Sequence, residues 1–88
     1  MNFRVEYPSE VQKRLDRVDR PTYERIEARM DELAADPFEP RISKALHGVE
    51  GVRSSRVGGW RICYTVSRDA RVVYILAVER RGQVYRRL

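Results

Sequence analysis

Two arginines flank a pair of glycines in the stretch SSRVGGWRICYTV, which covers residues 54–66. The residues on both sides of Gly58 and Gly59 alternate as they do in strands, and this pattern predicts a hairpin with a two-residue turn. In that hairpin Arg56 and Arg61 lie opposite each other on one face of the sheet. Like charges so placed cost about 0.2 to 1 kcal/mol, so an anion between them would explain the pair. Arginine binds phosphate in a planar, bidentate way, which favours phosphate as that anion.

A second basic cluster lies in ERRGQVYRRL, residues 79–88. There Tyr85 is surrounded by Arg80, Arg81, Arg86 and Arg87, and an aromatic ring among cations is typical of a site that stacks a base beside phosphates. Cationic neighbours also lower a tyrosine pKa from its usual value of about 10, which favours proton transfer by Tyr85. The alternative interpretation is that these arginines only keep an exposed sheet soluble and protect its edges.

The charge is divided unevenly along the 88 residues. Residues 1–40 hold 7 basic and 10 acidic residues, a net charge of −3, whereas residues 41–88 hold 11 basic and 3 acidic residues, a net charge of +8. All but two of the basic residues are arginines, the exceptions being Lys13 and Lys44. The basic half therefore predicts a polyanionic partner.

Other features limit the possible chemistry. Cys63 is the single cysteine, so no internal disulfide or cysteine metal cluster is expected, and His47 is the single histidine, so a histidine-pair nuclease is excluded. We expect no metal and no cofactor. The longest apolar run, residues 72–78, is too short to span a bilayer, and no signal peptide is evident. A cytoplasmic protein without membrane contact is the expectation.

The elements that must position these residues follow from hydrophobic periodicity. Residues 2–7 alternate as a first strand. Two helices are predicted next, the first from residue 9 and the second from about residue 21, with apolar stripes formed by Val11, Leu15 and Val18 and by Tyr23, Ile26, Met30 and Leu33. Residues 37–50 have no clear period and predict a loop. Three strand-like runs follow, at residues 52–57, 60–66 and 71–78, and predict an antiparallel meander.

These elements predict one α+β domain over residues 1–88, with a first strand, a two-helix hairpin and then the three-strand meander. In the middle run Trp60, Ile62, Tyr64 and Val66 share one side, which the helices must cover. Arg56 and Arg61 then lie on the other face, which is predicted to be open and basic. Residues 71–78 are apolar on both sides, so periodicity leaves their register open.

The chain resembles the RelE/ParE superfamily of bacterial toxins from type II toxin–antitoxin systems over nearly its whole length. Three motifs carry the resemblance: L-x-G-x-x-G, R-x-G-x-[WY]-R and a terminal R-x-x-V-Y-R. The first is formed by Leu46, Gly48 and Gly51, the second by Arg56, Gly58, Trp60 and Arg61, and the third by Arg81, Val84, Tyr85 and Arg86.

This resemblance implies a toxin that cleaves mRNA as an endoribonuclease in the ribosomal A site, and thereby inhibits translation, without a metal ion. It also implies a cognate antitoxin, in addition to mRNA and the ribosome, as partners. The resemblance assigns catalytic roles to Arg56, Arg61, Arg81 and Tyr85. Further RNA contacts are expected from Lys44, Arg53, Ser54, Arg80 and Arg86. Ser54 departs from the family pattern, in which a second basic residue is expected at this position.

Two other functions fit the sequence. The ParE branch of the superfamily inhibits DNA gyrase by protein contact and lacks the ribonuclease site, so the arginines would then contact protein. A nucleic-acid-binding module without catalytic activity is the second alternative. The terminal RRGQVYRR favours the ribonuclease, whereas Ser54 weighs against it.

Overall fold

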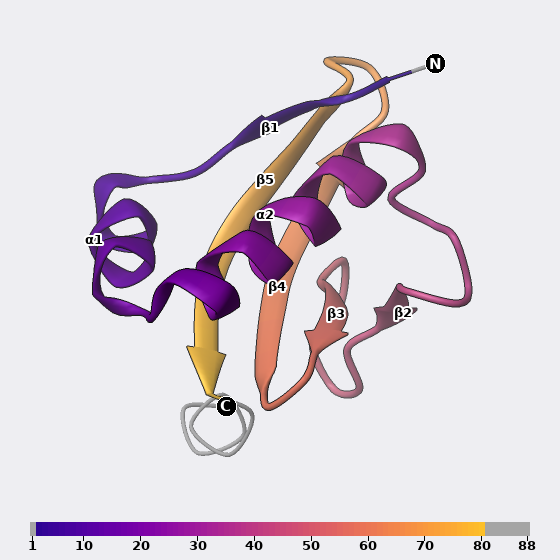
Figure 1. Cartoon of the computed structure of the whole chain (residues 1–88). Helices are drawn as coiled ribbons and strands as arrows, with labels where there is room; N and C mark the ends of the chain where they lie inside the picture. Colours follow the sequence, from indigo (N-terminus) through magenta and orange to yellow (C-terminus); the bar gives the residue numbers. More distant parts are fainter. Residues whose placement is uncertain (1, 81–88) are drawn as a thin grey trace.

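The computed structural model describes residues 2–80 of the chain. Two helices and five strands follow one another along these residues (Figure 1). They are β1 (Arg4–Glu6), α1 (Ser9–Arg17), α2 (Arg20–Ala35), β2 (Lys44–Ala45), β3 (Arg53–Val57), β4 (Trp60–Ser67) and β5 (Val72–Arg80).

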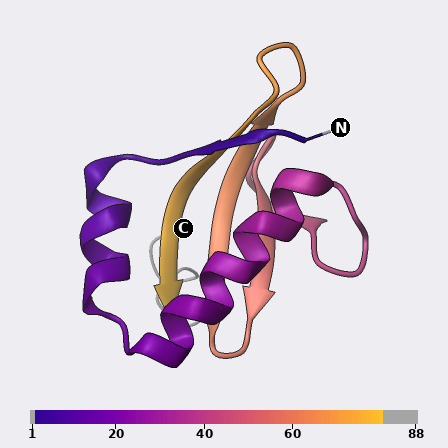
Figure 2. The same ribbon diagram turned by 45° about the horizontal axis from the view of Figure 1, so that its top comes forward.

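The strands form one mixed sheet in the order β1-β5-β4-β3-β2. β1 pairs parallel with β5, and the other neighbours are antiparallel. Figures 1 and 2 show α2 crossing one face of this sheet while α1 lies beside β5. The predicted α+β fold, with the helices on one face and an antiparallel meander, is confirmed.

Both helices pack through the stripes that the sequence predicts. Val11 and Leu15 of α1, and Ile26, Met30 and Leu33 of α2, are buried against the sheet. Asp19 caps the N-terminus of α2, because its carboxylate accepts a hydrogen bond from the Thr22 backbone N–H at 3.2 Å. These contacts hold both helices against the same face of the sheet.

The hairpin between β3 and β4 has the predicted register. Val57 pairs with Trp60 and Arg56 with Arg61, around a turn in which Gly58 has a φ of +58°. Left-handed backbone of this kind is open to glycine at little cost. Arg56 and Arg61 are therefore direct cross-strand neighbours.

The predicted loop at residues 37–50 contains a strand that the sequence analysis missed. Lys44 and Ala45 form β2, which pairs with Ser54 and Arg53 at the edge of the sheet. A chain of hydrogen bonds holds the preceding segment: Arg53 Nε donates to Ser43 Oγ, Ser43 to Tyr64 Oη, and Tyr64 to the Pro37 carbonyl. Polar contacts of this kind leave no hydrophobic period for sequence analysis to detect.

The face opposite the helices is less open than predicted. Leu46 and Cys63 are buried there, with Val49 and Val52 packed against them, because the segment after β2 folds over β4. Arg61 is only 4% exposed, whereas Arg56 is exposed. Both arginines lie on the face opposite the helices, as predicted, but only Arg56 is exposed there.

The register of β5 also became clear only from the structure. Cys63 pairs with Ala77 and Tyr64 with Ile75, which leaves Leu76 outside the ladder as a bulge. This register places Glu79 opposite Arg61. Neither helix in the described part of the chain is long and apolar enough to cross a bilayer.

Candidate functional site

Arg56 and Arg61 line a cavity of about 260 Å³ on the face of the sheet that α2 does not cover. Besides these two residues, its wall is formed by Arg29, Pro40, Arg41, Ile42, Ser43, Lys44 and Ser54. Five of the nine residues are cations, and none of them is acidic. We call this cavity the basic pocket. Such a concentration of positive charge favours an anionic ligand.

Arg61 is buried at the inner side of the basic pocket. Its Nη1 lies 3.4 Å from Ser54 Oγ, and the ladder places it between Arg56 on β3 and Glu79 on β5. An acidic neighbour opposite a buried guanidinium offsets part of the repulsion between the two arginines. Glu79 was missed because the apolar pattern of β5 left its register open.

Arg29 of α2 joins the helix layer to the basic pocket. Its Nη1 donates to the Arg56 carbonyl at 2.7 Å and to Ser55 Oγ at 2.9 Å. These bonds are possible because β2 pairs with β3 only at Arg53 and Ser54 and leaves the rest of that strand edge free. Sequence reasoning missed Arg29, although it lies three residues after Ile26 and thus beside the apolar stripe.

Lys44 and Ser54 are direct cross-strand partners of β2 and β3, on the same face as Arg56. Ser54 is 4% exposed, so its hydroxyl lies beneath the surface of the basic pocket. Lys44 is exposed, and it places a cation on the strand next to Ser54, the position at which the family pattern expects a basic residue. Arg41, which the sequence analysis also missed, completes the wall and forms an ion pair with Glu39 at 3.4 Å.

Two other residues predicted to bind RNA lie elsewhere. Arg53 points to the helix-covered side of the sheet, where its guanidinium carbon is 5.2 Å from the centre of the Phe38 ring. Arg80 pairs with Trp60 across the ladder and lies over the Trp60 ring at 5.3 Å. The structure does not bring either residue together with the Arg56–Arg61 pair. The predicted site residues Arg81, Tyr85 and Arg86 lie outside the described residues.

Acid–base groups do not occur in the wall of the basic pocket, whose described residues include no histidine, tyrosine or carboxylate. Cys63 is adjacent, but burial raises the pKa of its thiol more than the Arg61 charge lowers it. His47 is exposed on the segment after β2. No group of three or more metal-ligating side chains occurs within residues 2–80. The described pocket therefore offers positive charge to a ligand, without a general base.

A mixed sheet with two helices on one face and a cationic cavity on the other places the chain among small α+β proteins with a basic surface. Comparison with known families identifies the family. Residues 5–85 match the model described as the ParE toxin of the parDE type II toxin–antitoxin system, and the chain belongs to this family. The resemblance to RelE/ParE toxins is thereby confirmed. No curated protein matches the chain.

Solved structures of toxins share the fold. A chain of the archaeal RelE–RelB complex from Pyrococcus horikoshii OT3 is 26% identical, with a TM-score of 0.80 over 94% of this chain and 99% of that one. The RelBE2 toxin–antitoxin complex from Mycobacterium tuberculosis gives 24% identity and a TM-score of 0.77, over 92% and 100% of the two chains. The isolated RelE toxin from E. coli gives 19% and 0.76, over 99% and 94%.

Proposed function

We propose that this toxin is an endoribonuclease that holds an RNA phosphate in the basic pocket. The observation that supports the proposal is the presence of five cations and no carboxylate in the wall of one cavity of about 260 Å³. Exposed Arg56 and Lys44 are suited to meet the phosphate first, while buried Arg61 gives a fixed charge behind it.

The reaction that suits this arrangement is attack of a ribose 2′-hydroxyl on the adjacent phosphate. Its transition state carries extra negative charge, and preorganised guanidinium groups stabilise such charge. Arg29 contributes by holding the Arg56 carbonyl, which fixes the backbone from which that guanidinium extends. We assign the proton transfers to Tyr85 and a further phosphate contact to Arg81, as the family resemblance implies.

The partners of the proposed function follow from the same reasoning. The toxins from Pyrococcus horikoshii and Mycobacterium tuberculosis are seen in complexes with antitoxins, which supports a cognate antitoxin for this chain. We propose that the substrate is mRNA positioned by the ribosome in the cytoplasm, as the family resemblance implies.

A second candidate function is inhibition of DNA gyrase through protein contact. The match to the ParE family model over residues 5–85 favours it. In that case the arginines of the basic pocket would bind acidic side chains of the target or of the antitoxin.

One experiment separates the two functions. Programmed ribosomes and supercoiling by gyrase are each tested with the wild-type chain, with Arg56→Ala, and with Lys13→Ala, which removes one exposed cation from α1. The ribonuclease proposal predicts mRNA cleavage that Arg56→Ala lowers at least tenfold and Lys13→Ala leaves unchanged. Inhibited gyrase with intact mRNA would overturn it in favour of the second candidate.

A further inference from the structure

We propose that a second cavity, at the end of β4, binds a free guanine nucleoside monophosphate. This cavity of about 580 Å³ is lined by Phe38, by residues at the start of β3 and by the turn after β4, and among the described residues it shares no lining side chain with the basic pocket. Its volume lies within the range of about 300 to 1,000 Å³ that is typical of small-molecule sites. The inference goes beyond the proposed function, because it assigns a small ligand to residues that take no part in the proposed RNA cleavage.

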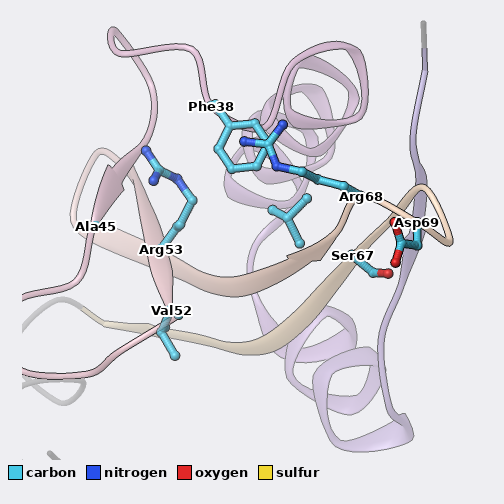
Figure 3. A pocket seen from close by; sticks show the side chains of 9 residues that line it. Phe38, Ala45, Val52, Arg53, Ser67, Arg68 and Asp69 are labelled. Carbon is cyan, nitrogen blue, oxygen red and sulfur yellow. The ribbon is translucent and has the colours of Figure 1, made fainter.

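The first feature of this cavity is a planar cation held on an aromatic ring. The guanidinium carbon of Arg68 lies 4.2 Å from the centre of the Phe38 ring. Figure 3 shows the Arg68 side chain extending across the cavity to reach this ring. Arginine planes stack on nucleobases as well as on aromatic side chains, so the opposite face of this guanidinium can stack on a base. Arg68 therefore offers a platform for a planar ligand.

The second feature is a cation at the other side of the cavity. Figure 3 shows Arg53 and Arg68 entering from opposite sides. Arg53 Nε donates a hydrogen bond to Ser43 Oγ at 2.8 Å, which holds the side chain in this position. Neither arginine forms an ion pair with a carboxylate of residues 2–80. The charge of Arg53 can therefore bind a phosphate group in a charge-assisted contact.

The third feature is a carboxylate next to the platform. Asp69 is the single acidic residue in the described wall, and it lies in the turn that the Ala70 backbone N–H closes by donating to Ser67 Oγ at 3.1 Å. An ionised carboxylate only accepts hydrogen bonds, and its two oxygens match two adjacent N–H donors. Guanine carries such a pair at N1 and N2, whereas adenine and cytosine carry a lone amino group. Asp69 therefore favours guanine as the base.

The register of the strands gives the length of the cavity. Arg53 pairs with Tyr64, and β4 continues from there to Ser67, where the turn with Arg68 begins. At about 3.3 Å per residue, these two ends of the cavity are about 10 Å apart. A nucleoside monophosphate carries its phosphate and its base on opposite sides of the ribose. It can therefore place the phosphate at Arg53 while the base stacks on Arg68, whereas inorganic phosphate would occupy one end alone.

The test is an NMR titration of the whole chain with guanosine monophosphate (GMP), adenosine monophosphate (AMP) and guanosine. GMP should shift the amide signals of residues 52–53 and 67–69. It should bind at least about tenfold more tightly than AMP, which lacks the paired N–H donors, and than guanosine, which lacks the phosphate. Equal binding of GMP and AMP, shifts confined to the basic pocket, or binding of a guanine-containing RNA without binding of GMP would each overturn the proposal.

Variants of the two exposed turn residues separate the contacts without disturbing the core. Asp69→Asn should remove the preference for GMP over AMP, because an amide has a single acceptor oxygen. Arg68→Lys keeps the charge but loses the plane, and should weaken binding of GMP and AMP about tenfold alike. Lys13→Ala is the control and should change neither affinity.

Two results with these variants would contradict the proposed contacts. A retained preference for GMP in Asp69→Asn would exclude recognition of guanine by this carboxylate, and wild-type affinity in Arg68→Lys would exclude stacking. RNA cleavage plays no part in these measurements, so this proposal and the ribonuclease proposal can fail independently.

Discussion

Arg56 and Arg61 occupy equivalent positions in the ladder but differ in what they contribute. Arg56 is exposed at the rim of the basic pocket, whereas Arg61 is 4% exposed and approaches Ser54 Oγ. A side chain at the rim can bind a ligand without supporting the fold. A buried guanidinium supports both, because its removal leaves a void and exposes partners that it had covered.

This difference predicts separate effects on stability. Arg61→Ala should lower the free energy of unfolding by about 1 to 3 kcal/mol, because it leaves the buried Ser54 hydroxyl without its hydrogen-bond partner. Arg56→Ala should change it by less than about 0.5 kcal/mol. Urea unfolding of both variants measures the values. Equal stability of Arg61→Ala and the wild type would contradict the account of its burial.

Cys63 gives a prediction for alkaline pH. Burial raises the pKa of its thiol above the ordinary value of 9.0, so the folded protein favours the protonated form. The associated stability is fully present below that ordinary pKa and is lost as the pH rises through the folded pKa. Cys63→Ala should therefore show a smaller loss of unfolding free energy than the wild type between about pH 8 and about pH 10. Parallel curves for the two proteins would contradict this.

At the scale of elements, the β3–β4 hairpin depends on one of its two glycines. A Cβ at Gly58 would lie 2.9 Å from Arg25 Nη2, and the backbone there has a φ of +58°. A Cβ at Gly59 would meet no atom within 4 Å. The two positions thus provide a test and its matched control.

Gly58→Ala should lower the free energy of unfolding by about 1 to 2 kcal/mol, the cost of left-handed backbone for an L-residue. Gly59→Ala should have an effect below about 0.5 kcal/mol. Thermal melts of both variants compare them. A larger loss at Gly59 than at Gly58 would show that the turn is held differently from the one described here.

The elements also show what sequence patterns can predict. The Gly58-Gly59 turn fixed the pairing of Arg56 with Arg61, because a two-residue turn leaves one register. β2 and Glu79 were not predictable in this way. β2 is only two residues long and is held by polar contacts, so it has no hydrophobic pattern to detect. β5 is apolar on both faces and has a bulge at Leu76, so the pattern of its residues does not indicate which of them pairs with β4.

At the scale of the whole molecule, the two halves of the sequence do not form two separate surfaces. Arg29 comes from the acidic half, yet α2 carries it to the edge of β3, where it lines the basic pocket with residues of the basic half. Charge counting along the sequence predicts a polyanionic partner, but it could not assign Arg29 or Arg41 to the basic pocket. Only the packing of α2 and of the segment after it brings these cations together.

If the basic pocket holds an RNA phosphate, the affinity of the protein for RNA should depend on salt through Arg56. The affinity for a single-stranded RNA made uncleavable by 2′-O-methyl groups is measured at several salt concentrations, for the wild type, Arg56→Ala and Lys13→Ala. Each phosphate contact contributes about 0.7 to the slope of log affinity against log salt for single strands. Arg56→Ala should reduce this slope by about 0.7, whereas Lys13→Ala should leave it unchanged. An unchanged slope in Arg56→Ala, with binding equal to the wild type, would contradict the claim.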